Sequence, residues 1–222
     1  MHRIAQLLVA ASLLVGLVAA ARPALAAGPT AAQIAERVQM LYDSSKTYQA
    51  HFEQTYTIKV QNVKKVSTGT VAFEKPGKMS FRYDKPVGNR AVADGKTIKV
   101  YESDNQQMYV TKMKMSQYPA ALAFLMGKGR LEHDFNLKLL DPARMKMEGG
   151  YVLECTPKEA TPAYQKVLLY VDGQTNQVRR VLILDAQGNK NRFDFSNPTV
   201  NKALPKDEFD FTPPDGTTIV NS

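Results

Sequence analysis

The sequence predicts a mainly β protein with helices (α+β), built as a single curved antiparallel sheet of about ten strands with helices on its concave side. Three observations lead to this prediction. Most segments after residue 47 alternate apolar and polar side chains, which is the repeat of half-buried strands. Turn dipeptides such as Pro76-Gly77, Asp94-Gly95 and Asp172-Gly173 separate the segments. No internal repeat or linker divides the chain, so residues 27–222 are expected to form one domain.

Residues 1–26 are expected to be a cleaved signal peptide. A positive start at Arg3 precedes an apolar run over residues 4–21, and Ala24-Leu25-Ala26 matches the small-x-small cleavage pattern. A membrane anchor is the competing interpretation, which the cleavage site disfavours. Because no cysteine lies near the cleavage site, a lipid-anchored lipoprotein is not expected, and the product should be exported to the periplasm without a membrane anchor.

The net charge is +8, and the segment from Lys59 to Arg90 carries much of this excess. Such a segment is either a solvated basic face of the sheet or a surface that attracts anionic lipid or an acidic partner protein. Nucleic-acid binding is not expected, since export removes the usual targets. Cys155 is the single cysteine, so no intrachain disulfide forms, and its strand-like setting indicates a buried structural thiol.

The first element of the mature chain is an amphipathic helix. Thr30 and Gln33 have the spacing of a capping box, and the helix is expected to end near Ser44-Ser45. One helical face carries Ile34, Val38, Leu41 and Tyr42.

From Tyr48 the period changes to two, and strands follow one another through short turns. Residues 112–129 interrupt this pattern with a short apolar helix, on which Leu122, Leu125 and Met126 form one stripe. The later strands include 167–171 and 181–184, which are apolar on both faces. Both faces of these strands must therefore be covered: one can meet the cavity or core, and a helix is one candidate for the other.

The sequence has no catalytic signature. It lacks a nucleophile elbow, a metalloprotease helix, paired cysteines and a phosphate loop, and His51 and His133 stand alone. No enzymatic activity, metal or cofactor is therefore expected. The mature chain has eight methionines and no tryptophan. Flexible methionines suit either ligands of variable shape or ordinary gap filling in a core, and both interpretations stay open.

The chain resembles the outer-membrane lipoprotein carrier protein family, LolA. The resemblance covers nearly the whole mature chain and depends on the order and spacing of several motifs. They are Tyr-x-Ala-His-Phe-Glu-Gln-Thr at 48–55, Gly-x-Val-x-Phe-x-Lys-Pro from Gly69, Phe-Arg-Tyr-Asp-Lys-Pro at 81–86, Asp-Gly-Lys-Thr-Ile-Lys-Val-Tyr at 94–101, and Phe-Asp-Phe-Thr-Pro-Pro-Asp-Gly at 209–216.

The resemblance implies an unclosed β-barrel with helices that form a lid over a hydrophobic cavity. It also implies a monomeric periplasmic chaperone that takes acylated lipoproteins from an inner-membrane ABC transporter and delivers them to an outer-membrane receptor. The family has an arginine before the hairpin proline that ties the barrel to the lid. Lys75 stands at that position here, and a lysine offers a point charge in place of a planar fork of donors. We expect Lys75 to be the lid latch.

Strand parity then places the cavity wall. Val71 and Phe73 share one face with Lys75, and Ile98 and Val100 face inward if Lys99 faces water. The predicted acyl-chain wall is Val71, Phe73, Met79, Phe81, Tyr83, Ile98 and Val100, and the predicted lid side chains are Leu122, Leu125 and Met126.

Two alternatives keep the same half-barrel: a periplasmic carrier of free lipids or glycolipids, and a sensor. A further alternative is a lipid-processing enzyme. A sensor usually needs a second domain, for which the mature chain has no room, and an enzyme needs a nucleophile that the sequence does not reveal. The same side chains can also form a closed core with no ligand.

Overall fold

The computed structural model describes residues 28–112 and 129–221. The predicted signal peptide and the inserted segment with Leu122, Leu125 and Met126 lie outside these residues. The elements in chain order are α1 (Ala31–Ser44), β1 (Thr47–Ile58), β2 (Val63–Glu74), β3 (Lys78–Lys85), β4 (Arg90–Asp94), β5 (Thr97–Glu102), β6 (Gln107–Lys112), α2 (Leu131–Asp134), β7 (Phe135–Leu140), β8 (Gly150–Pro157), β9 (Lys166–Asp172), β10 (Val178–Leu184), β11 (Lys190–Val200) and β12 (Thr218–Asn221).

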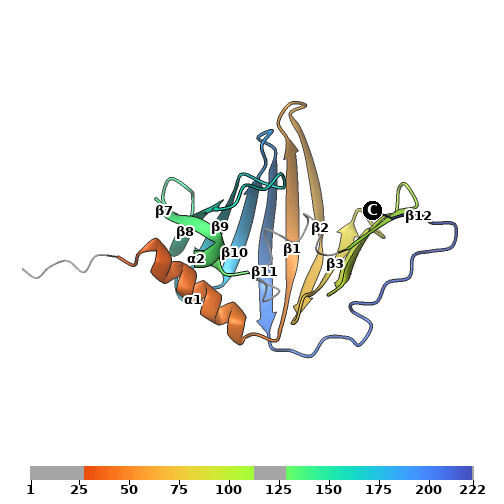
Figure 1. Ribbon diagram of the computed structural model, residues 1–222, viewed down its shortest axis with the longest axis horizontal. Coiled ribbons are helices and arrows are strands. Elements are labelled where there is room, and N and C mark those ends of the chain that lie inside the picture. Colours follow the sequence, from red (N-terminus) through yellow and green to blue (C-terminus); the bar gives the residue numbers. More distant parts are fainter. Residues whose placement is uncertain (1–27, 113–128, 222) are drawn as a thin grey trace, which may run out of the picture.

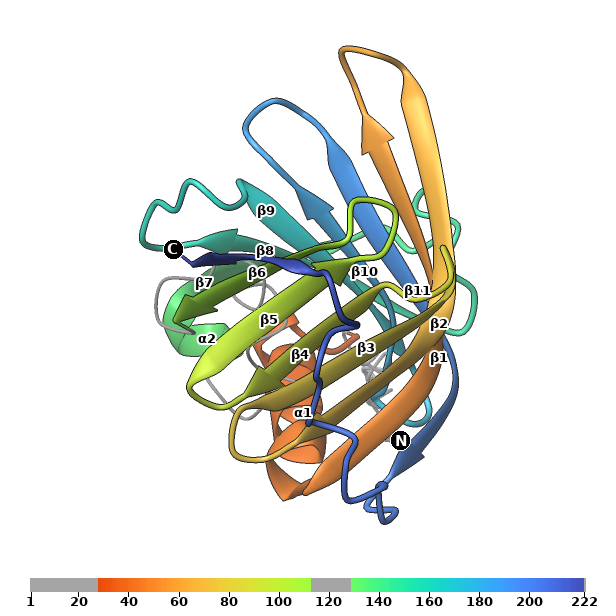
Figure 2. The ribbon, with the colours of Figure 1, turned by 90° about the vertical axis from the view of Figure 1, so that its right-hand side faces the viewer.

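The strands form one sheet that curves around α1 without closing. Its order is β12-β6-β5-β4-β3-β2-β1-β11-β10-β9-β8-β7, so β12 and β7 are its two edges. Figure 1 shows the fan of strands with α1 on its concave side, and Figure 2 shows α1 within the curve. The predicted fold class is confirmed. The sheet has twelve strands, against about ten expected. The prediction of a purely antiparallel sheet was wrong at one edge, because β12 pairs parallel with β6.

Helix α1 begins and ends where its sequence signals lie. The Thr30 hydroxyl accepts the Gln33 N–H at 3.2 Å, and the Gln33 side chain accepts the Thr30 N–H at 2.9 Å. This capping box satisfies donors that the first turn leaves without helical partners. At the other end the Ser45 N–H donates to the Tyr42 carbonyl at 3.2 Å. The local pattern therefore determined this helix.

The long hairpin of β1 and β2 connects the two halves of the sheet, since β1 also pairs with β11. Gly69 lies where β2 passes close to β3. A Cβ at this position would overlap the Arg82 carbonyl and lie 3.0 Å from the Phe52 ring. The close approach of two backbones explains the need for glycine.

The C-terminal segment before β12 crosses the convex face of β2 to β5 (Figure 2). Phe209 packs there on Ala72 and Val92. The Lys99 side chain lies on the convex face, where it is half-buried and its ammonium donates to the Phe211 carbonyl at 3.1 Å. Ile98 still faces inward, because the strand alternation that placed it does not depend on what covers the other face.

A buried polar cluster holds the C-terminal segment to the sheet. Arg90, Ser80 and Glu208 are each at most 6% exposed. The Arg90 guanidinium donates to the Glu208 carbonyl at 2.7 Å and pairs with its carboxylate at 3.6 Å. Ser80 donates to the same carboxylate, and Arg82 pairs with it at 3.4 Å. Because every charge in this cluster has a partner, its burial is tolerated.

The strands that are apolar on both faces are covered twice, as expected, but not by a second helix. On the convex face, Val152, Leu168 and Tyr170 pack against Met145 and Met147. These methionines belong to the connection between β7 and β8. An irregular segment with flexible thioethers can cover an uneven surface as well as a helix can.

Candidate functional site

The apolar residues of the concave face meet in rows across the first five strands. Tyr48 is opposite Phe73, Phe73 opposite Met79, Met79 opposite Ala93, and Ala93 opposite Ile98. The neighbouring row contains Ala50, Val71, Phe81, Ala91 and Val100. Most of the residues proposed for an acyl-chain wall therefore lie together on one surface.

Burial differs along this surface. Val71, Phe73, Met79, Phe81 and Ile98 are at most 2% exposed and belong to the main core cluster. Tyr83 and Val100 are half-buried and pack against that cluster. All seven side chains belong to or pack against one apolar cluster, and their role as an acyl-chain wall stays a prediction.

Aromatic rings form the middle of the concave face. The Phe52 ring centroid lies 5.2 Å from those of Phe81 and Tyr83, and Phe81 lies 5.7 Å from Phe193. Phe193 stacks on Phe195 at 6.4 Å. Phe52, Phe193 and Phe195 are not among the residues predicted for the site. Their alternation in strands was visible, but only the pairing of β1 with β11 shows that they join the same surface.

Helix α1 lies on the concave side of the sheet, where it contacts β7 and β8 and, through the Tyr42 ring, approaches Tyr48 of β1. Ile34, Val38 and Tyr42 are at most 1% exposed and join the same cluster as the sheet residues. The Tyr42 hydroxyl accepts the Val178 N–H at 3.1 Å, and its ring lies 5.9 Å from that of Tyr48. Burial raises the pKa of both phenols well above the usual range, so both stay neutral. The helix thus contributes uncharged, apolar surface to the interior.

Lys75 connects the β2–β3 turn to the C-terminal end of α1. Its ammonium donates to the Tyr42 backbone carbonyl, which also accepts the Ser45 N–H. Burial lowers the pKa of Lys75, and the nearby Asp43 carboxylate opposes this shift. A cation at the carbonyl end of a helix also meets the negative end of its dipole. The contact joins sheet to helix as a latch would, and the latch role itself stays a prediction.

A second contact ties α1 to α2. The Leu131 N–H donates to the Gln39 side-chain oxygen at 3.1 Å, and the Gln39 amide nitrogen donates to Asp43 at 2.9 Å. A cleft of about 120 Å³ lies beside this contact, between the two helices. Sequence reasoning missed it, because a glutamine on a surface helix gives no sign of its partner 92 residues away.

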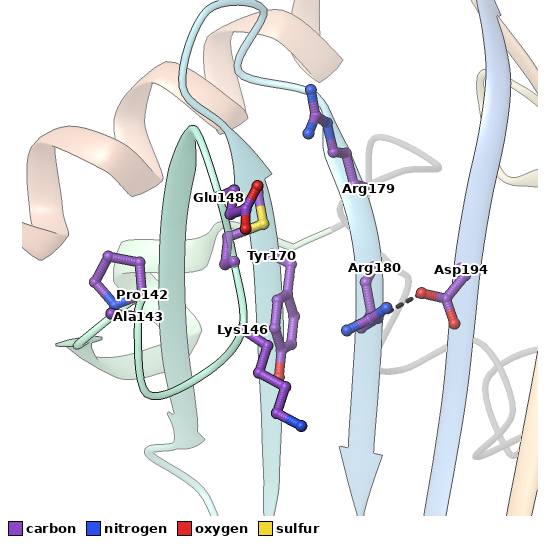
Figure 3. Close-up of a pocket in the computed structure, with 9 residues that line it drawn as sticks. Pro142, Ala143, Lys146, Glu148, Tyr170, Arg179, Arg180 and Asp194 are labelled. Atoms are coloured by element: carbon purple, nitrogen blue, oxygen red, sulfur yellow. Dashed lines mark hydrogen bonds and ion pairs between the residues drawn. The ribbon is translucent and has the colours of Figure 1, made fainter.

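A separate cavity of about 830 Å³ lies on the convex face, between the β7–β8 connection and strands β9 to β11 (Figure 3). Arg180 stacks over the Tyr170 ring at 5.0 Å and pairs with Asp194. Arg179 pairs with Asp172. Because charged side chains with partners line much of this cavity, it does not suit aliphatic chains.

The described residues contain no group of three His, Cys, Asp or Glu side chains placed to hold a metal ion. His133 is exposed and pairs with Asp134 at 2.7 Å. Cys155 is 1% exposed, and burial raises the pKa of its thiol from 9.0 to about 12. It is thus a structural thiol, as expected, and not an activated nucleophile. No helix in ranges 28–112 and 129–221 has the length and apolar character needed to cross a bilayer.

The fold and the site define a class of protein: an unclosed, curved β-sheet with an apolar concave face and a helix packed on that side. The family described as "Outer membrane lipoprotein carrier protein LolA" matches residues 43–212, and the chain belongs to this family. Carriers of this family are not an enzyme class.

Individual relatives agree. An outer-membrane lipoprotein carrier protein of Nitrosomonas europaea is 29% identical, with 86% of this chain and 91% of that protein aligned. One from Methylibium petroleiphilum is 31% identical, over 88% and 93%. Among solved structures, an uncharacterized conserved protein from Thermus thermophilus shares the fold with a TM-score of 0.52 and 14% identity, over 86% of this chain and 99% of that one.

Proposed function

We propose that this chain is a periplasmic carrier that binds the acyl chains of lipoproteins released from the inner membrane. It receives them from an ABC transporter and delivers them to an outer-membrane receptor. Residues 1–26 direct export, and residues 27–222 act as one domain. Membership of the LolA family and the names of the relatives support this proposal.

The observation that carries the proposal is the single apolar cluster shared by α1 and the concave face of the sheet. Exposing acyl chains to water is unfavourable by about 25 cal/mol for each Å² of apolar surface, so a carrier must bury them. Where α1 moves away from the sheet, it uncovers a surface with the aromatic and aliphatic chemistry that such chains need. The proposed wall is Val71, Phe73, Met79, Phe81, Tyr83, Ile98 and Val100, and the proposed lid side chains are Leu122, Leu125 and Met126.

Release requires that binding be reversible. The contact of Lys75 with the Tyr42 carbonyl is one bond at the end of α1, so it can break without unfolding the sheet. We assign Lys75 as the latch that holds the helix over the bound chains.

Two experiments test the carrier function. The mature protein, purified from its native periplasm, is expected to co-elute with acylated protein identified by mass spectrometry. Free lipid alone would indicate the alternative carrier of lipids or glycolipids. In vitro, a triacylated lipoprotein peptide should bind, and the same peptide without acyl groups should not. Equal binding of both peptides would contradict the proposal.

A matched pair of variants locates the site. Val100 is half-buried on the concave face, so Val100→Glu places a charge on the proposed wall at modest cost to folding. Val87 is 81% exposed in a turn, so Val87→Glu makes the same change elsewhere. Val100→Glu should lower acyl-peptide affinity at least tenfold, and Val87→Glu should not change it. Equal affinities for the two variants would show that the chains bind elsewhere.

A further inference from the structure

The β1–β2 hairpin projects beyond the rest of the sheet (Figures 1 and 2). On one side, β3 pairs with β2 only as far as Thr68. On the other side, β11 pairs with β1 only as far as Thr57. Residues 59–66, here called the hairpin tip, therefore extend beyond the parts of β1 and β2 that pair with β11 and β3, and all eight are exposed.

The hairpin tip exposes apolar side chains that do not pack against the rest of the protein. Val60 is 88% exposed, Val66 is 57% exposed and Val63 is 39% exposed. Single exposed apolar residues are common on proteins, but three within one short tip are not scattered. Val60 lies at the end of the hairpin, and Val63 and Val66, three residues apart on one strand, point to opposite faces.

The charge of the hairpin tip is positive throughout. Lys59, Lys64 and Lys65 are its charged residues, and no acidic residue occurs between Glu53 and Glu74. A hydrogen bond holds the base of the tip, where the Lys59 N–H donates to the Asn189 side-chain oxygen at 3.0 Å. Several other basic side chains of the sheet have acidic partners, as Lys78 does with Glu74 at 2.6 Å and Lys166 with Glu154 at 2.9 Å. The tip thus combines unneutralised cations with exposed valines.

We propose that the hairpin tip docks on a bilayer surface that contains anionic phospholipid. Its lysines would meet the phosphates, while the valines enter the headgroup region. A protein partner would present one surface, whereas this tip exposes valine at its end and on both of its faces. A fluid medium that surrounds the tip satisfies all three side chains at once, and its negative charge matches the lysines.

The docking surface is far from the proposed latch. Strand β2 runs from the hairpin tip to Lys75, which at about 3.3 Å per residue places them about 40 Å apart. A protein seated by its tip therefore leaves α1 and Lys75 away from the bilayer. This inference goes beyond the carrier function, and its test contains no lipoprotein, so either can fail without the other.

Vesicle flotation of the mature chain tests the proposal. The protein should bind vesicles of phosphatidylcholine mixed with phosphatidylglycerol, should bind phosphatidylcholine vesicles much less, and should dissociate as salt rises. The double variant Lys64→Glu/Lys65→Glu should lose binding by on the order of 25-fold, taking about fivefold for each lysine. The control Lys202→Glu/Lys206→Glu makes the same charge change at two exposed lysines outside the tip and should keep its binding.

Insertion has its own measurement. The chain has no tryptophan, so Val60→Trp introduces a single fluorophore at the end of the tip. Its emission should shift to the blue on mixed vesicles and not on phosphatidylcholine alone. Absence of binding to mixed vesicles at low salt, or equal losses in the tip and control variants, would overturn the proposal. Cross-linking of the tip to an acidic membrane protein without vesicle binding would assign the surface to a protein instead.

Discussion

Replacing Lys75 with leucine tests how the helix is held to the sheet. The substitution keeps an aliphatic stem but removes the donor to the Tyr42 carbonyl. A hydrogen bond from a charged donor contributes about 1.5–3 kcal/mol. Lys75 is half-buried, and the carbonyl keeps the Ser45 N–H, so the net loss should be smaller, about 1–2 kcal/mol. That energy corresponds to a 5- to 30-fold change in the equilibrium for opening of α1.

Amide hydrogen exchange measures this opening directly. In Lys75→Leu, the α1 amides from Ile34 to Tyr42 should exchange about 5- to 30-fold faster, while those of β9 should be unchanged. Lys99→Leu is the matched control, since that lysine also donates to a backbone carbonyl but does so on the convex face. Lys75→Arg should restore protection, because a guanidinium offers further donors to the same carbonyl.

Two outcomes would refute this reasoning. Unchanged exchange of α1 in Lys75→Leu would show that apolar packing alone holds the helix. Faster exchange of α1 in Lys99→Leu, to the same extent, would show a general loss of stability and not the loss of a latch. If the latch also acts in transport, bound acyl peptide should dissociate faster from Lys75→Leu in proportion to the exchange rates.

Three further predictions follow from the packing. Cys155 should react with thiol reagents at neutral pH only after unfolding. Because burial raises the pKa of this thiol from 9.0 to about 12, the unfolded chain loses the proton first. The free energy of unfolding should therefore fall as pH rises from 9.0 towards 12, which urea titrations in that pH window can measure. Arg90→Met should lower the free energy of unfolding by about 3 kcal/mol in urea, because it removes a buried partner of Glu208; a loss below 1 kcal/mol would mean that Arg82 and water compensate. Gly69→Ala should cost about 1–3 kcal/mol in thermal unfolding, since the added Cβ overlaps the Arg82 carbonyl, and an unchanged melting temperature would show that β3 moves away freely.

Local signals in the sequence were read reliably because they act over a few residues. The capping box placed the start of α1, and strand alternation placed Phe73 and Met79 on one face. The Pro76-Gly77 turn lies between β2 and β3 as expected. Alternation states that a strand has two unlike faces, but it does not state what covers each face. Alternation therefore gave no sign that the C-terminal segment lies over Lys99, or that an irregular segment and not a helix packs on the second face of β9.

The sequence by itself determined the family, the mainly β class, the order of most strands and the burial of the concave side chains. Only the tertiary structure decided the contacts between distant segments: Lys75 with the Tyr42 carbonyl 33 residues earlier, and Arg90 with Glu208 118 residues later. It also decided the parallel pairing of β12 with β6. The physical reason is that hydrophobic periodicity specifies which side of an element is buried. The partner of a single polar side chain instead depends on which distant segments the curvature of the whole sheet brings into contact.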